Sequence, residues 1–164
     1  MILPKDLKTG DVLHCRGNGI IARLIMWATK SKWSHTAVYI EVYGQPFIIE
    51  AQANGVNLKS YYEWLKKYGY YYEVSRNRHL TDHKLFALSI MALSGVKGYD
   101  FVSLLIRQPI SLITGRWRKR KVEDDRFYCS EFAMYAHDVE KSYRMSPQNV
   151  YDYCMNSPEW EEID

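Results

Sequence analysis

Two β-rich runs, residues 35–42 and 46–51, are separated only by Tyr43-Gly44-Gln45. Runs of β-branched and aromatic residues on either side of a short loop that contains glycine are typical of a β-hairpin. The strands of a hairpin are antiparallel, and one of their faces is normally covered by other elements. We therefore expect an antiparallel sheet that includes this hairpin.

The rest of the chain supplies one short strand, then helices and a further strand. The expected elements are a strand over 12–15, a helix over 19–30, an amphipathic helix over 58–68, a strand over 70–76, a helix capped by Thr81 or Asp82 and running to about Ser94, helix and loop over 101–114, a helix from Asp124 or Asp125 to about Lys141, and turns at Ser146-Pro147 and Ser157-Pro158. This order predicts an α+β fold, a small antiparallel sheet packed against helices.

The chain is long enough to bury a core of its own. Its 164 residues contain no internal repeat and no linker of low complexity, so we expect a single domain over residues 1–164. The first residues lack the apolar core of a signal peptide, and no run reaches the roughly 18 apolar residues of a membrane span. These features predict a cytoplasmic protein.

The positive charge is concentrated in one segment. Five of the 22 basic residues lie within 116–121, and the other 17 are slightly outnumbered by the 19 acidic residues. This distribution argues against nucleic-acid binding by the whole protein. An apolar run over 102–113 precedes the basic residues, and this combination predicts contact with an anionic membrane or polymer. The alternative is a core helix followed by a solvated loop. The basic residues are Arg116, Arg118, Lys119, Arg120 and Lys121.

The three cysteines are widely spaced and form no Cys-x-x-Cys motif, which excludes the usual zinc and disulfide patterns. His79 and His83 have the i, i+4 spacing of a metal-binding pair, but no third ligand lies nearby in the sequence. We therefore predict neither a metal nor an organic cofactor.

Cys129 lies close to the expected start of a helix, after Asp124 and Asp125. The positive end of a helix dipole stabilises a thiolate, and an adjacent imidazole can accept the thiol proton. Cys129 is therefore a candidate nucleophile. The alternative is a buried structural cysteine, which is common because free cysteine is among the most buried residue types.

His35 and Glu50 are the candidate partners of this thiol. His35 opens the first strand of the hairpin, and Glu50 is a carboxylate inside the apolar run Phe47-Ile48-Ile49-Glu50-Ala51. If Tyr43-Gly44 is a two-residue loop, Glu50 faces Ala37 and becomes the diagonal neighbour of His35, within reach of long side chains. A loop at Gly44-Gln45 would leave Glu50 too far away. The alternatives are a histidine with a purely structural hydrogen bond and a salt bridge from Glu50 to a lysine or arginine.

Several short motifs together resemble the permuted papain-like cysteine hydrolases, in the YiiX-like branch of the NlpC-type superfamily. They are, in order, Gly10-Asp11-Val12-Leu13, Trp33-Ser34-His35-Thr36-Ala37-Val38-Tyr39, Ile49-Glu50-Ala51, Tyr99-Asp100 and Tyr128-Cys129-Ser130-Glu131. The resemblance covers roughly residues 8–150 and implies a circularly permuted papain-like fold, in which the histidine precedes the cysteine. The basic segment 116–121 is not a feature of that family.

The resemblance implies that Cys129 is the nucleophile, His35 the general base, and Glu50 the residue that orients the imidazole. Trp33, Tyr99 and Tyr128 are the expected substrate-binding residues, with ordinary packing as the alternative for the two tyrosines. The family consists mostly of amidases and peptidases, often of cell-wall peptides. We therefore expect a cysteine peptidase or amidase that forms an acyl-enzyme, of bacterial or phage origin. The alternatives are a lipid-directed acyltransferase or thioesterase and a binding module without turnover.

Overall fold

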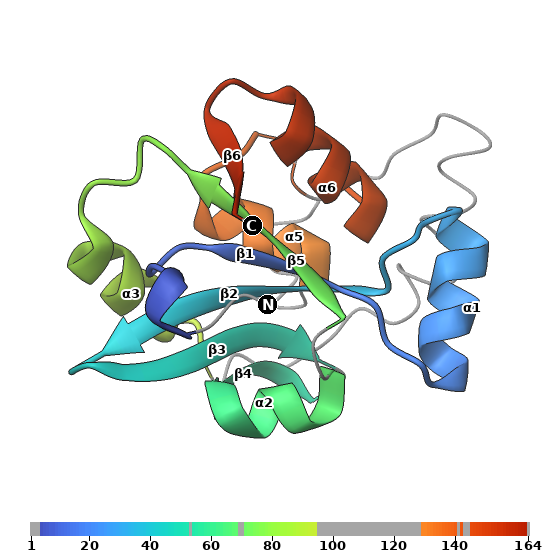
Figure 1. Cartoon of the computed structure of the whole chain (residues 1–164), viewed down its shortest axis with the longest axis horizontal. Helices are drawn as coiled ribbons and strands as arrows, with labels where there is room; N and C mark the ends of the chain where they lie inside the picture. Colours follow the sequence, from blue (N-terminus) through green and yellow to red (C-terminus); the bar gives the residue numbers. More distant parts are fainter. Residues whose placement is uncertain are drawn as a thin grey trace.

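A six-stranded antiparallel sheet forms the centre of the protein, with the strands in the order β4-β3-β2-β1-β5-β6 (Figure 1). The computed structural model describes residues 4–52, 54–68, 71–94, 129–140, 142 and 145–163. The strands are β1 (Val12–Cys15), β2 (His35–Val42), β3 (Gln45–Gln52), β4 (Gly55–Ser60), β5 (Tyr72–Asn77) and β6 (Trp160–Ile163). The α+β fold class predicted from the sequence is confirmed.

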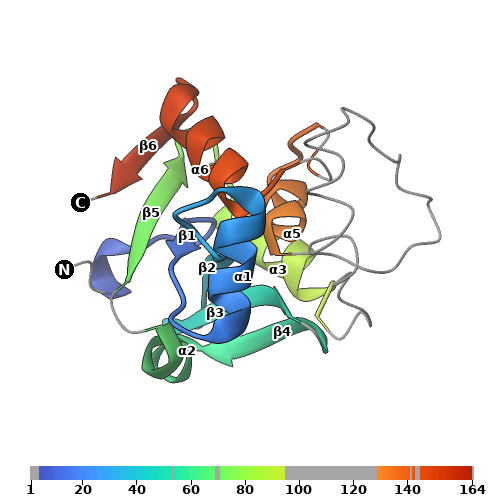
Figure 2. The same ribbon diagram turned by 90° about the vertical axis from the view of Figure 1, so that its right-hand side faces the viewer.

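Helices cover both faces of this sheet. They are α1 (Ile20–Thr29), α2 (Tyr61–Tyr68), α3 (His83–Met91), α5 (Cys129–Ala136) and α6 (Pro147–Asn156), with a short 3-10 turn at Pro4–Asp6. α3, α5 and α6 pack on the face that carries Val38 and Ile40, and α2 packs on the face that carries Tyr39 and Ile48. α1 stands at one end of the sheet, away from both layers (Figures 1 and 2).

The hairpin between β2 and β3 has the tight turn that the sequence predicts. Val42 pairs with Gln45, and Tyr43 and Gly44 between them both have positive φ, 51° and 73°. Two consecutive positive φ values define a type I′ turn, whose twist matches that of the flanking strands. This register continues along β3, so Glu50 lies opposite Ala37, on the same face as His35.

Two expected boundaries near α2 and α5 are wrong. Residues 55–60 form strand β4, and the helix expected from residue 58 begins at Tyr61. Val56 and Leu58 alternate with polar residues, which is the period of a strand.

The helix α5 ends at Ala136 and does not continue to Lys141. Asp138 adopts a left-handed conformation with φ 56°, and the Val139 N–H donates a hydrogen bond to the Met134 carbonyl. This pattern is a Schellman cap.

The C-terminal region contains two elements that the sequence analysis did not predict. Ser146 begins helix α6 as a capping residue: its hydroxyl accepts a hydrogen bond from the Asn149 N–H, the Asn149 side chain accepts from the Ser146 N–H, and Pro147 occupies the first turn. β6 then pairs with β5 at the edge of the sheet. The segment expected as helix and loop, 101–114, lies outside the described residues, as do Asp124 and Asp125.

A buried ion pair connects the start of β1 to β5. Asp11 is 1% exposed, and it accepts hydrogen bonds from Arg76 Nε at 2.8 Å and from a terminal guanidinium nitrogen at 2.7 Å. The backbone N–H of Lys8 donates a further bond to Asp11 at 2.8 Å. The two parallel bonds of this pair fix the N-terminal segment against the sheet.

We expect the substitution Asp11→Ala to lower the free energy of unfolding by about 3 kcal/mol, because it leaves the Arg76 guanidinium without its buried partner. Urea denaturation monitored by circular dichroism measures this change. Glu73→Ala is the matched control, since Glu73 pairs at 3.4 Å with Lys32 and both side chains are well exposed. That control should cost less than about 1 kcal/mol. Equal losses in the two variants would contradict this account.

Candidate active site

His35 is the first residue of β2, at the end of the sheet that faces α1 (Figure 1). It pairs in register with Cys15 of β1. Ser34, the preceding residue, makes three hydrogen bonds. Its N–H and its hydroxyl both donate to the Cys15 carbonyl, and the hydroxyl accepts from the Gly17 N–H at 2.8 Å. These bonds hold the backbone that carries the His35 ring, which is mostly buried.

Glu50 is fully buried in β3 and contacts the His35 ring directly. The distance between His35 Nε2 and Glu50 Oε2 is 2.6 Å, a short charge-assisted hydrogen bond. Trp64 of α2 donates its indole N–H to the same carboxylate oxygen at 3.1 Å. The other oxygen accepts from the Gln52 side-chain amide and lies 3.6 Å from Lys59 Nζ. A buried carboxylate is tolerated only with such partners, so Glu50 is held in one orientation.

Cys129 is the first residue of α5, and its side chain is hydrogen-bonded to His35. The helix packs against β2 and β3, which brings its N-terminus to the end of the sheet where His35 lies. The next residue, Ser130, is also buried and donates its hydroxyl to the Met145 carbonyl at 2.7 Å. The start of α5 is therefore anchored to the segment that leads into α6.

The charges of the three side chains are strongly coupled. Burial disfavours a charged imidazole, but the Cys129 sulfur and the Glu50 carboxylate outweigh this and raise the pKa of His35 from 6.5 to about 10. Burial also opposes ionisation of Glu50, yet the His35 charge and hydrogen bond, aided by Lys67 and Lys59, lower the pKa of that carboxyl. The site therefore favours a charged imidazolium beside an ionised Glu50 carboxylate.

The structure brings together the three residues predicted as catalytic: Cys129, His35 and Glu50. The expected alternative for Glu50, a salt bridge to a lysine, is also present, because Lys59 approaches the second carboxylate oxygen. Tyr99 and Tyr128, predicted to contact substrate, lie outside the described residues. So do the basic residues predicted to contact a membrane or polymer, Arg116, Arg118, Lys119, Arg120 and Lys121. Those predictions remain open.

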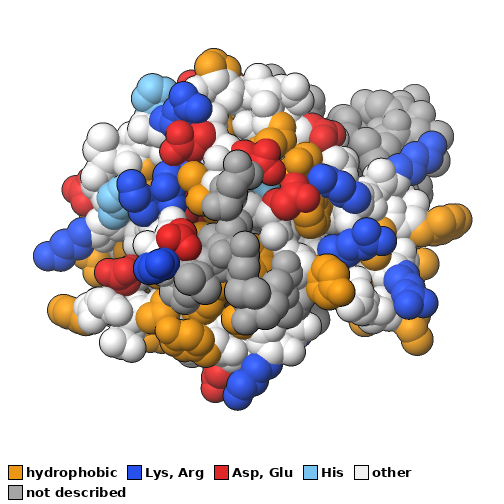
Figure 3. All heavy atoms as spheres, viewed as in Figure 1, with side chains coloured by type: hydrophobic (Ala, Val, Ile, Leu, Met, Phe, Trp, Pro, Cys, Tyr) orange, Lys and Arg blue, Asp and Glu red, His pale blue; other side chains and the backbone are white. Residues whose placement is uncertain are grey.

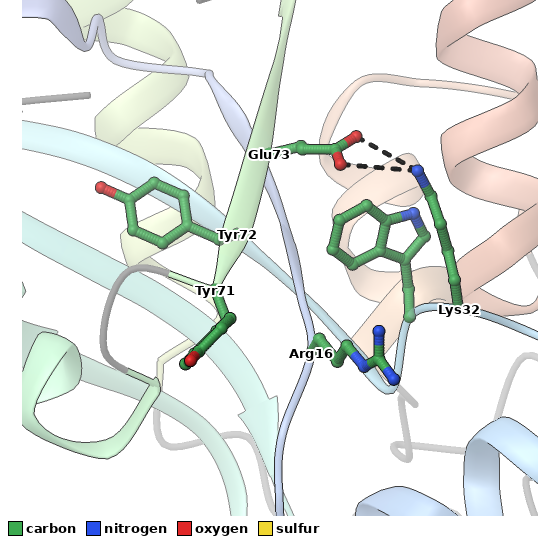
Figure 4. A pocket seen from close by; sticks show the side chains of 6 residues that line it. Arg16, Lys32, Tyr71, Tyr72 and Glu73 are labelled. Carbon is green, nitrogen blue, oxygen red and sulfur yellow. Dashed lines mark hydrogen bonds and ion pairs between the residues drawn. The ribbon is translucent and has the colours of Figure 1, made fainter. Parts of the chain in front are cut away.

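Trp33, the third residue predicted to bind substrate, lines a hollow of about 280 Å³ near this site (Figure 4). The other lining residues are Arg16, Lys32, Tyr71, Tyr72 and Glu73. Tyr72 pairs with Cys15, which pairs on its other side with His35, so the hollow lies at the same end of the sheet as His35. Two strand spacings separate the Tyr72 and His35 backbones by about 10 Å. Lys32 stacks over the Trp33 ring and pairs with Glu73 at 3.4 Å.

The sequence did not indicate which residues other than His35 bond to the Glu50 carboxylate, above all Trp64. The amphipathic pattern of 58–68 places an apolar side chain at position 64. That pattern indicates burial against the sheet, and Trp64 is indeed 1% exposed. It does not show that the indole N–H meets a carboxylate on β3. A buried tryptophan needs an acceptor for its N–H, and the isolated buried Glu50 is the only signal that could have suggested the pair.

No family model matches the sequence, and no curated protein matches it. Among solved structures, the chain is similar to the metalloprotein yiiX from Escherichia coli O157:H7, with 18% sequence identity, a TM-score of 0.68 and coverage of 97% of each chain. At this identity the likeness shows the fold alone. It supports the YiiX-like part of the resemblance seen in the sequence, whereas the papain-like assignment remains a prediction.

That structural neighbour is described as a metalloprotein, so the side chains of the present chain bear on whether it could hold a metal ion. Within the described residues, no group of three or more His, Cys, Asp or Glu side chains could hold one. His35 is bonded to both Glu50 and Cys129, so its ring nitrogens are already engaged. His83, half of the predicted i, i+4 pair, is bonded through Nδ1 to the Thr9 carbonyl at 2.7 Å. These donors do not fit a metal centre.

We expect the His35 ring resonances to titrate at about pH 10 in the native protein, as its raised pKa requires. The substitution Glu50→Gln removes the charge of one of the two neighbours that raise this pKa and should lower that midpoint by more than about one unit. Nuclear magnetic resonance of the imidazole C–H groups measures both values. Glu161→Gln is the control, because it removes an exposed carboxylate far from the ring, and it should leave the midpoint unchanged.

The same shift has a consequence for stability. Folded His35 holds its proton more tightly than the unfolded chain, whose histidines titrate near 6.5. Its contribution to stability is therefore complete below pH 6.5 and is lost as the pH rises toward 10.

A His35 titration midpoint near 6.5 in the native protein, unchanged by Glu50→Gln, would show that the carboxylate does not act on the ring.

Proposed function

We propose that this protein is a cysteine-dependent hydrolase that cleaves an amide bond, with Cys129 as nucleophile, His35 as general base and Glu50 as the residue that orients the imidazole. The observation that carries this proposal is the uninterrupted chain of contacts from the Cys129 thiol through the His35 ring to a fully buried carboxylate. A nucleophile, a base in hydrogen-bond contact with it and a third group that orients the base are the parts that acyl transfer requires.

At rest the proton of the Cys129 thiol already lies on His35, in a thiolate–imidazolium pair. The thiolate attacks the carbonyl carbon of the amide, and the C=O π electrons move to the oxygen. When the C–N bond breaks, His35 gives its proton to the departing amine, leaving a thioester on Cys129. His35 then takes a proton from water, whose oxygen attacks the thioester, and the acid is released as the thiol reforms.

The start of α5 supports the charged steps of this sequence. Cys129 is the first residue of the helix, and the first four backbone N–H groups of a helix have no acceptor within the helix. The Cys129 N–H is thus a candidate donor to the developing oxyanion, and the helix dipole favours negative charge at the same place. Glu50 keeps the imidazole charged and correctly turned while its own charge is offset by Trp64, Gln52 and Lys59.

The order of these residues along the chain supports a permuted papain-like arrangement. His35 and Glu50 lie on strands that precede the helix of the proposed nucleophile. The fold of yiiX is similar to that of this protein over nearly the whole chain. Cell-wall peptides are the substrate class we favour. The hollow at the same end of the sheet, which is not lined by Cys129, His35 or Glu50, combines aromatic rings with Arg16, Lys32 and Glu73. Such a lining suits a substrate that carries both amide and carboxylate groups.

The proposal predicts that iodoacetamide alkylates Cys129 rapidly at neutral pH, and that His35→Ala slows this reaction by more than about tenfold, because the imidazolium no longer stabilises the thiolate. The measurement is the pH dependence of the alkylation rate, with mass spectrometry to locate the adduct. Glu50→Gln should give an intermediate rate. A rate that follows an ordinary thiol and ignores His35→Ala would contradict the proposal.

The chain offers its own controls for this experiment. Cys129 is itself buried, and Cys15 and Cys154 are equally buried thiols that lack its hydrogen bond to His35. Burial raises the pKa of Cys15 well above its usual value and that of Cys154 to about 12. Both should remain unlabelled in the folded protein. An activity-based electrophilic probe that labels the native protein but not Cys129→Ala would also separate the hydrolase from a binding module, which needs no reactive thiol.

A further inference from the structure

The largest exposed hydrophobic side chains of helix α1 lie along one side of it. Ile20 is 87% exposed, Trp27 78%, Ile21 56% and Leu24 45%. In a helix of 100° per residue, Ile20, Leu24 and Trp27 form a single stripe, and Ile21 lies next to it. Ile25 and Thr29 are buried and point the opposite way. The helix therefore presents a continuous apolar face to solvent, where a globular surface helix normally presents polar residues.

The position of α1 makes this face available to a flat partner. The helix projects from the end of the sheet, beyond β1 and β2 (Figures 1 and 2). It is held to the protein by its buried side and by its two connections to those strands. A protruding convex helix cannot enclose a ligand, but it can enter a surface that deforms around it.

Basic residues flank the apolar face along the chain, and no acidic residue lies in the same stretch of sequence. Arg16, Arg23 and Lys30 are exposed, and the sequence from Val12 to Ile40 contains no aspartate or glutamate. Among the described residues none of these three forms an ion pair. Figure 3 shows hydrophobic and basic side chains together at this end of the molecule. A protein partner for this region would need an acidic surface, and an anionic bilayer provides one that is also apolar below its headgroups.

We propose that α1 is a membrane-docking helix that inserts Ile20, Leu24 and Trp27 between the headgroups of an anionic lipid bilayer, with Arg16, Arg23 and Lys30 on the lipid phosphates. In the described part of the chain, no helix has the length and hydrophobicity that crossing a bilayer requires. At ten residues, α1 spans about 15 Å, so it lies in the interface. Tryptophan is the residue most typical of that depth.

Docking in this way orients the rest of the molecule. Only residues 30–34 separate α1 from His35, so the end of the sheet that carries His35 comes to the lipid surface. The helix is a different part of the chain from the basic segment 116–121, for which the sequence predicts membrane contact. The inference does not depend on Cys129 being a nucleophile, because it rests on surface residues alone.

Vesicle co-sedimentation of the whole chain tests the proposal. We expect the protein to bind phosphatidylcholine vesicles that contain phosphatidylglycerol, to bind pure phosphatidylcholine much less, and to be released by salt. The triple substitution I20S/L24S/W27S should reduce binding by more than about 30-fold, because binding scales with the apolar area inserted. R23Q should reduce it by about fivefold, the value of one basic residue near an anionic surface.

The control is L85S/L88S on α3, which removes two leucines that are 60% and 57% exposed but lie outside this basic surface. It should bind vesicles like the native protein. Every variant replaces exposed residues, and unchanged thermal unfolding will verify that each is folded. Emission of Trp27 gives an independent readout: addition of anionic vesicles should shift the fluorescence to the blue, and W27F should abolish the shift.

Three results would overturn the proposal. The first is the absence of binding to anionic vesicles. The second is binding, or a blue shift, that persists in I20S/L24S/W27S and W27F, which would place the lipid contact elsewhere in the chain. The third is a native protein that self-associates without lipid and becomes monomeric in the triple variant, since a second copy would then cover α1.

Discussion

The buried contact between His35 and Glu50 is the constraint on which the rest of the site depends. A carboxylate with no solvent exposure is costly unless charge and hydrogen bonds compensate it, and Glu50 receives both from the His35 ring at 2.6 Å and from Trp64 at 3.1 Å. This pairing requires the β2–β3 register in which Val42 faces Gln45. A shift of one residue would turn Glu50 to the opposite face, so the type I′ turn at Tyr43-Gly44 is part of the site.

Each layer of the fold contributes one side of this arrangement. The sheet places the imidazole and the carboxylate on neighbouring strands, α2 closes over the carboxylate with Trp64, and α5 brings Cys129 to the ring. Ser34 and Ser130 fix the backbone beside the base and beside the sulfur. Removing His35 or Trp64 would take away a hydrogen-bond partner of the buried Glu50 carboxylate. The contact among Cys129, His35 and Glu50 therefore depends on how the sheet, α2 and α5 pack together.

The sequence predicted the parts of this structure whose signals are local. Gly44 marked the turn, the β-branched and aromatic residues of 35–42 marked the strand, and Glu50 in an apolar run indicated a paired carboxylate. Strand β4 and the start of α2 were misplaced because the aromatic residues from Tyr61 onward dominate the helical pattern and mask the alternation of Val56 and Leu58. The indole contact of Trp64 could not be predicted, because it depends on how α2 packs across the sheet and not on any spacing along the chain.

The most direct test of the central claim is the ultraviolet absorbance of the thiolate, measured against pH in the native protein and in Cys129→Ser. If Cys129, His35 and Glu50 act as one charged unit, the native protein will show thiolate absorbance at neutral pH that the serine variant lacks. If the absorbance difference between the two proteins develops only in the alkaline range of an isolated thiol, near pH ~8.5, the three side chains do not form a catalytic unit.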